Sequence, residues 1–187
     1  MQVLLRHLTL FLVFTTAFAC SDRNKKIHAE TDSPIVEGKS HDDKSVDKLV
    51  LSDSEWKARL TPIQFNILRE KGTEPAFSGE YNAYKKDGLY VCSACDNPLF
   101  DSTTKFDSGT GWPSYTEPVS TKRVLKVADN SYGMSRIEVK CARCDGHLGH
   151  IFNDGPAPTG ERWCINSASL KFRARDNLDD DEDHVSK

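Results

Sequence analysis

The segment Arg162–Asn166, with the sequence RWCIN, places a thiol between a guanidinium and an amide. If the segment is a β-strand, its side chains alternate, so Arg162, Cys164 and Asn166 share one face. The guanidinium would then lower the pKa of the thiol, and the amide would offer donors to a substrate or an oxyanion. Free cysteines are also commonly buried and inert. The local sequence therefore leaves Cys164 as either a nucleophile or a core residue.

His147 and His150 lie three positions apart, shortly after a pair of cysteines. Histidine exchanges protons near neutral pH, so both are candidates for acid–base catalysis. They could instead ligate zinc, although four nearby cysteines would complete a zinc shell without them. Trp112 lies between glycine and proline in the loop Gly109–Ser114, where it could be a surface platform or a buried plug.

Four of the six cysteines form two Cys-x-x-Cys pairs, Cys92 with Cys95 and Cys141 with Cys144. Each pair is expected in a turn after a strand, and two such turns can supply the tetrahedral four-sulfur shell that zinc accepts. The wide gap between the pairs means that the metal would join two distant parts of the domain. Two disulfides or a redox-active pair are alternatives, but a disulfide across two intervening residues is strained. A fully ligated zinc has no open position, so its role would be structural.

The composition indicates an ordinary folded domain with polar tails. The chain has 187 residues, 37% hydrophobic and 28% charged, with a formal net charge of -3. This length suits one domain plus tails or two very small domains. Lysine and arginine form no dense cluster, which argues against a nucleic-acid partner.

Residues 1–19 are typical of a signal peptide, because a short basic start precedes an apolar run too short for a mature membrane helix. The run ends in Ala17-Phe18-Ala19-Cys20, which resembles a bacterial lipobox with alanine where leucine is expected. Cleavage after Ala19 without lipid, or a buried N-terminal helix, are the alternatives. We expect an exported protein of the bacterial cell envelope or periplasm, anchored by lipid on Cys20.

The rest of the chain divides by composition. Residues 20–50 are polar and aperiodic and predict a flexible tether, whereas residues 174–187 predict an acidic disordered tail. The domain is expected at residues 51–173. Within it, Ser52-x-x-Glu55 forms a capping box that opens a helix, and Thr61-Pro62 opens a second helix that Gly72 ends.

Short extended stretches follow the helices. Residues 89–92, 136–141 and 161–166 are predicted strands, separated by Gly, Pro, Asp and Asn. The fold class is therefore mainly β (α+β), with antiparallel strands and helices on the N-terminal side.

An ordered set of motifs resembles the methionine sulfoxide reductase B family across residues 51–172. The motifs are Gly72–Glu80, Pro98–Phe100 with Lys105–Gly109, Gly111–Pro113, His147–His150, Asp154–Pro156 and Cys164–Ser169. Each motif alone is modest, but their shared order and spacing are specific to the family.

The resemblance implies two small antiparallel sheets with N-terminal helices, stapled by a structural zinc site. It implies reduction of the R epimer of methionine sulfoxide in peptides and proteins, which leaves Cys164 as a sulfenic acid. His147, His150 and Asn166 would donate a proton or position water. Arg162 would favour the thiolate, and Trp112 would form the pocket wall against the S-methyl group.

One position departs from the family pattern. Many members carry a resolving cysteine in the loop where this chain has Thr110. We therefore expect a one-cysteine cycle, in which an external thiol such as a thioredoxin-like protein or glutathione attacks the oxidised Cys164. Cys20 is an alternative resolving thiol if it carries no lipid, since the tether could span on the order of 30 Å.

Partners would be oxidised peptides and proteins and the thiol reductant, with a monomeric chain and no membrane contact beyond the lipid. Two other classes compete with this interpretation. A zinc-ribbon-like binding module explains the four paired cysteines but not Cys164. A thiol–disulfide carrier would use one Cys-x-x-Cys pair for exchange.

Overall fold

A computed structural model describes residues 46–177 of the chain. The predicted signal peptide, Cys20, most of the tether and most of the acidic tail lie outside the described residues. Within residues 46–177, no helix has the length and apolar character needed to cross a membrane.

Two short helices open the domain, α1 (Asp53–Arg59) and α2 (Pro62–Glu70). Helix α1 begins with the reciprocal capping box that the sequence predicted at Ser52. Thr61 forms a second capping box at the start of α2. The predicted end of α2 at Gly72 was wrong by one residue. Lys71 adopts the left-handed conformation at φ 59° and ends the helix, because its backbone N–H bonds back to Asn66.

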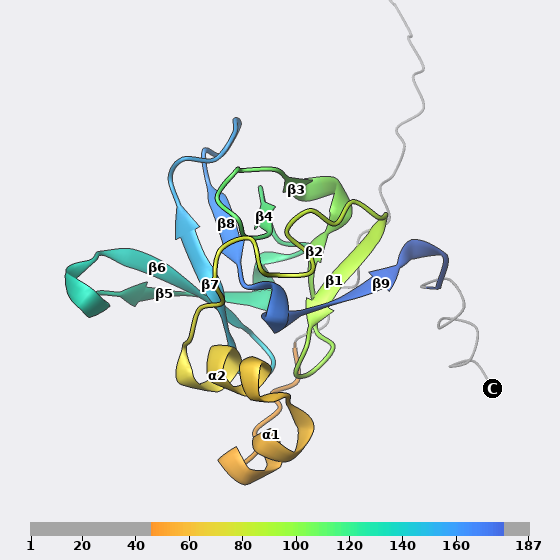
Figure 1. Ribbon diagram of the computed structural model, residues 1–187, viewed down its shortest axis with the longest axis vertical. Coiled ribbons are helices and arrows are strands. Elements are labelled where there is room, and N and C mark those ends of the chain that lie inside the picture. The colour runs from red at the N-terminus through yellow and green to blue at the C-terminus, as the bar shows by residue number, and fades with distance from the viewer. Residues whose placement is uncertain (1–45, 178–187) are drawn as a thin grey trace, which may run out of the picture. The chain divides into compact units, whose positions relative to one another are not determined.

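Two antiparallel sheets follow the helices (Figure 1). The smaller sheet has the order β2-β1-β9 and the larger has the order β3-β4-β8-β7-β6-β5. The strands are β1 (Gly88–Cys92), β2 (Pro98–Asp101), β3 (Lys105–Phe106), β4 (Ser114–Tyr115), β5 (Val124–Asp129), β6 (Arg136–Cys141), β7 (His147–Phe152), β8 (Arg162–Ile165) and β9 (Leu170–Ala174). This arrangement confirms the predicted fold class.

An aromatic core fills the space between the sheets. Phe100 and Tyr115 stack with ring centroids 4.4 Å apart, and Tyr90 meets Tyr115 edge-on at 5.3 Å. Trp163 packs edge-on against Phe100 and is buried, as is Ile165 two positions further along β8. The core side of β8 is therefore occupied by Trp163 and Ile165, as the predicted alternation required.

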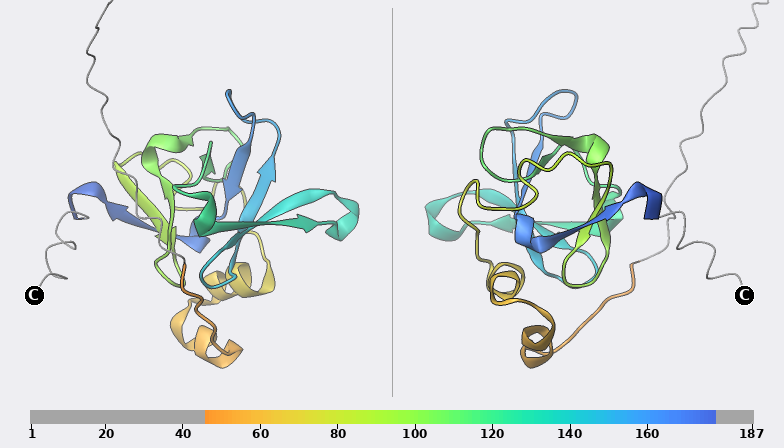
Figure 2. Two further views of the ribbon diagram at one scale, coloured as in Figure 1. Left: turned by 180° about the vertical axis from the view of Figure 1, so that it is seen from behind. Right: turned by 45° about the vertical axis from the view of Figure 1, so that its right-hand side comes forward.

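The strands β5 and β6 form a long hairpin that projects beyond the rest of the larger sheet (Figures 1 and 2). Its tip is the short 3-10 turn η3 (Ser131–Gly133). Exposed apolar side chains line this hairpin, among them Val127, Met134 and Ile137.

Strand register brings the catalytic candidates together. Cys164 on β8 lies opposite His150 on β7 and opposite Ser114 on β4. Residues directly opposite each other share a sheet face, so these three side chains lie on one side. Gly149 permits the close pairing, because a Cβ there would lie 2.0 Å from the carbonyl oxygen of Cys164.

Candidate active site

Cys164 opens onto a cavity of about 180 Å³ on this face of the larger sheet. The cavity is lined by residues of the loops before β1 and β4 and of strands β6, β7 and β8, namely Thr73, Trp112, Arg136, Gly149, His150, Phe152, Cys164, Ile165 and Asn166. Of the six site residues predicted around the thiol, Cys164, His150, Asn166 and Trp112 line the cavity. His147 and Arg162 are buried and do not line it.

Three groups surround the Cys164 thiol and act on its pKa in different directions. Burial raises the pKa of the thiol above its ordinary value, and this outweighs the neighbouring Arg162 guanidinium and the hydrogen bond from Thr110, which both lower it. Asp154 adds a smaller upward contribution to the same pKa. The arginine therefore acts in the expected direction, but burial favours the neutral thiol.

Arg162 is held rigidly at the back of the cavity. Its Nε and Nη2 donate to the two carboxylate oxygens of Asp154 at 2.8 and 3.0 Å, a bidentate pair. Its guanidinium also lies 4.5 Å from the ring centroid of Phe152. The side chain is buried, so its charge is fixed beside the thiol and is poorly screened by water.

A chain of hydroxyl groups approaches the thiol from the loop before β4. The Ser114 and Ser108 hydroxyl oxygens lie 2.8 Å apart, and Ser108 lies 2.8 Å from the Thr110 hydroxyl. The Thr110 hydroxyl lies near enough to Cys164 to lower the pKa of its thiol. The position where many family members have a resolving cysteine is thus close to the nucleophile candidate.

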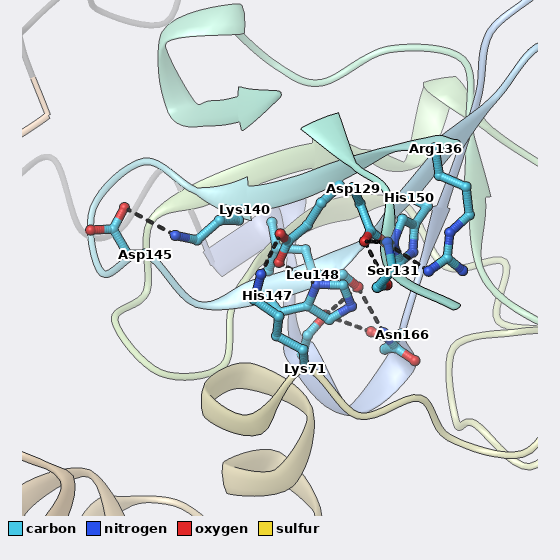
Figure 3. A network of polar contacts seen from close by, with 12 residues as sticks. Lys71, Asp129, Ser131, Arg136, Lys140, Asp145, His147, Leu148, His150 and Asn166 are labelled. Atoms are coloured by element: carbon cyan, nitrogen blue, oxygen red, sulfur yellow. Dashed lines mark hydrogen bonds and ion pairs between the residues drawn. The ribbon is translucent and has the colours of Figure 1, made fainter. Parts of the chain in front are cut away.

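His150 is anchored by the β5–β6 hairpin (Figure 3). Its Nε2 lies 2.8 Å from an Asp129 carboxylate oxygen, which also accepts from Arg136 at 2.7 Å. Bonds from the Ser131 hydroxyl and backbone, followed by the His150 contact, keep the pKa of Asp129 far below its ordinary value. An ionised Asp129 therefore binds Nε2, and Nδ1 takes no part in that bond.

His147 lies beside His150, with ring centroids 5.3 Å apart. Residues three apart in a regular strand point to opposite faces, but the register of β7 against β6 shifts at Leu148, so both rings lie on one side. His147 Nδ1 bonds Glu138 at 2.8 Å, and Glu138 also accepts from Lys71. Burial lowers the pKa of His147 despite Glu138, so the ring is neutral at pH 7.

Asn166 and Trp112 are fixed by backbone partners. Asn166 donates through Nδ2 to the carbonyl of Leu148 at 3.0 Å and accepts from the Glu74 N–H at 3.2 Å. Trp112 Nε1 donates to the Glu74 carbonyl at 3.0 Å, so the half-exposed indole ring is held as one cavity wall. The loop around Glu74 thus ties these two lining residues together.

The two Cys-x-x-Cys turns come together in a separate, buried cluster. The sulfurs of Cys92 and Cys144 are 3.7 Å apart, those of Cys95 and Cys141 are 3.5 Å apart, and all four lie within 4.8 Å of one another. A tetrahedron with Zn–S bonds of about 2.3 Å has sulfurs about 3.8 Å apart. The four cysteines are therefore positioned to bind a metal, and the spacing fits zinc.

The two turns are nearly identical in backbone structure. Asp96 and Asp145 each follow the second cysteine in the left-handed conformation, at φ 58° and 57°. In each turn the first cysteine N–H bonds the carbonyl five positions on, Asn97 or Gly146. One turn follows β1 and the other follows β6, so a bound metal would link the smaller sheet to the larger one.

Several residues around the thiol were not predicted from sequence. Asp129, Glu138 and Arg136 come from the hairpin and reach the histidines only through strand pairing. No local motif marks them. Asp154 belongs to a family motif, but its bond to Arg162 was not predicted.

Comparison with known proteins identifies the family of the chain. Residues 60–174 match the SelR domain family. The chain is 58% identical over 130 residues to the peptide methionine sulfoxide reductase MsrB of Pseudomonas syringae, which covers 70% of this chain and 99% of the relative. It is 55% identical over 133 residues to a protein of the same name from Methanosarcina barkeri, covering 71% and 92%.

A mouse relative, the mitochondrial methionine-R-sulfoxide reductase B3, is 53% identical over 135 residues, which cover 72% of this chain and 53% of the relative. The chain therefore belongs to the SelR domain family, the methionine sulfoxide reductases of the B type, and is an oxidoreductase. This confirms the family that the sequence motifs predicted.

Proposed function

We propose that the chain reduces the R epimer of methionine sulfoxide in peptides and proteins, with Cys164 as the nucleophile. The main support is the position of Cys164. It is the one cysteine among residues 46–177 that lies outside the four-sulfur cluster, and it opens onto a cavity walled by an indole. The names of the relatives agree with this activity.

In the first step the Cys164 sulfur attacks the sulfoxide sulfur. The thiol and the sulfoxide become a sulfenic acid and methionine, so oxygen passes to Cys164 and the methionine sulfur is reduced. The raised thiol pKa means that attack needs a proton acceptor or a charge change on substrate binding. Arg162, held by Asp154, stabilises the thiolate as it forms.

The sulfoxide oxygen must gain a proton before it can leave. His150 lines the cavity, and its bond to Asp129 leaves Nδ1 for this transfer. His147 lies behind His150 and acts as a positioning residue together with Glu138. Asn166 holds the Leu148 carbonyl between the two histidines, so its main effect is also on their placement.

Recycling would use an external thiol. Thr110 occupies the position beside Cys164 and cannot form a disulfide, so an incoming thiol such as a thioredoxin-like protein or glutathione attacks the sulfenic acid. Two molecules of simple thiol, or one dithiol, then return Cys164 to the thiol and release water.

Zinc would act as a structural ion on Cys92, Cys95, Cys141 and Cys144. A fully ligated zinc joins the two sheets and leaves no position for substrate. We also propose that the protein is an exported, monomeric lipoprotein attached through Cys20 that repairs oxidised proteins in the cell envelope. Palmitate labelling that is unchanged by Cys20→Ser would contradict the anchor.

The activity is tested with the separated epimers of N-acetyl methionine sulfoxide amide and dithiothreitol. We expect turnover of the R epimer and at least about a hundredfold less turnover of the S epimer, since one reductase type acts on each epimer. Equal turnover of the two epimers, or no turnover of the R epimer, would contradict the proposal.

A further inference from the structure

Two exposed aromatic side chains lie in segments that contain or adjoin residues lining the catalytic cavity. Phe77 is 69% exposed and Tyr132 is 92% exposed. Single exposed apolar side chains are common on soluble proteins, so exposure alone does not mark these two rings as functional.

Tyr132 directly follows a residue that is linked to His150 through hydrogen bonds. It follows Ser131, whose backbone and hydroxyl both donate to Asp129, and Asp129 binds His150 (Figure 3). Arg136, at the start of β6, lines the cavity itself. The hairpin tip is thus fixed beside the cavity.

Phe77 is bonded to the loop that carries the lining residue Trp112. Its N–H donates to the Gly111 carbonyl at 2.8 Å, and Gly111 immediately precedes Trp112. A Cβ at Gly111 would lie 2.9 Å from the Phe77 ring, so the ring rests against this loop. Thr73, four positions before Phe77, lines the cavity.

Both aromatics adopt a backbone conformation that does not suit them. Five non-glycine residues in the described part of the chain have positive φ. Two are aspartates in the cysteine turns and one is the lysine that ends α2, whereas Phe77 has φ 65° and Tyr132 has φ 54°. Bulky residues are rare in this region, where Asn or Gly would be easier, and such strain is concentrated at functional sites.

The size of the cavity indicates which part of a peptide substrate stays outside it. At about 180 Å³ it is smaller than the roughly 300–1,000 Å³ of sites that enclose a small molecule. It can therefore accept one side chain and leaves the peptide main chain and its neighbours outside. Methionine is usually buried among apolar residues, so a protein segment exposed by its oxidation carries apolar neighbours.

We propose that Phe77 and Tyr132 bind the apolar side chains that flank methionine sulfoxide in an extended protein segment. This inference rests on the proposed function. The two rings would give the enzyme a preference for oxidised methionines with apolar neighbours over those with polar neighbours.

The test uses two blocked pentapeptides that carry the same central R sulfoxide, one flanked by leucine and the other by serine. We expect the wild-type kcat/KM to favour the leucine peptide about tenfold, the effect of two partly buried apolar contacts. The double variant Phe77→Asn/Tyr132→Asn should reduce that ratio to about twofold or less. Asparagine tolerates positive φ, so the melting temperature should be unchanged or higher.

Two further variants serve as controls. Ile63→Asn removes an exposed apolar side chain on α2, away from the cavity, and should keep the tenfold ratio. Tyr132→Phe retains the ring and should also keep it. The inference is overturned if wild type and the double variant show the same ratio, or if wild type shows none. If the wild-type enzyme does not reduce the R epimer of N-acetyl methionine sulfoxide amide, the proposed function itself is overturned.

Discussion

The cysteines of this protein occupy two contrasting environments. Cys92, Cys95, Cys141 and Cys144 are buried in two matching turns, with their sulfurs directed at one another. Cys164 is partly open to a cavity and has an arginine and a hydroxyl beside it instead of other thiols. The same side chain is therefore suited to hold a metal in one place and to attack a substrate in the other, because of its neighbours alone.

The variant Cys164→Ser should give the largest difference between an effect on activity and an effect on the cysteine cluster. The activity should fall by at least about 10⁴-fold, since serine is a far weaker nucleophile at this site. Zinc content and the free energy of unfolding should stay close to wild type. Turnover assays, metal analysis and thermal unfolding measure the three quantities. A loss of zinc in this variant would show that the two environments are not independent.

Cys141→Ser should have the opposite pattern. It removes one of four metal ligands that join the two sheets, and we expect a loss of about 3–5 kcal/mol in unfolding free energy with loss of metal. Denaturant titration with and without a chelator measures the effect. If the variant folds as stably as wild type and retains activity, the cluster is not a structural centre.

Cys164 should also differ in its response to pH. Burial raises its pKa, so the thiolate fraction and the rate of alkylation by iodoacetamide should rise with pH without a plateau below pH 9.0. Arg162→Met removes a group that lowers this pKa, so the rise should move to higher pH and the alkylation rate at pH 7 should fall about tenfold. Peptide mass spectrometry assigns the alkylated residue. A plateau near pH 7 in wild type would contradict the account.

The smallest effect is expected from Thr110→Cys. Thr110 lies near enough to Cys164 to affect its pKa, so an introduced thiol should form a disulfide with Cys164 after one turnover. The rate of methionine release should change less than about threefold, because that step precedes the disulfide. Thr110→Ser is the matched control, and it should give no disulfide. Failure of the introduced thiol to pair would mean that the loop holds position 110 too far away.

Sequence predicted the elements whose signals are local. The capping box of α1, the start of α2 at Thr61-Pro62, the strand around Cys164 and the paired cysteine turns each depend on residues within a few positions of one another. The end of α2 was misplaced because Lys71, and not a glycine, takes the left-handed conformation.

Contacts that depend on the pairing of distant strands could not be predicted from local sequence patterns. Asp129 and Glu138 reach the two histidines only after β5, β6 and β7 pair. A register shift at Leu148 puts both histidines on one face, and the sequence carries no signal of this irregularity. The burial of Cys164, which outweighs the arginine, likewise depends on the complete fold.

The central claim is that Cys164 takes the sulfoxide oxygen without a partner thiol. The most direct measurement is a single turnover of the mature enzyme with the R epimer and no reductant, followed by a sulfenic-acid trap and mass spectrometry. We predict about one methionine released per enzyme and one trapped adduct, on Cys164. A disulfide between Cys164 and Cys20, or an adduct on any of the four clustered cysteines, would contradict the account.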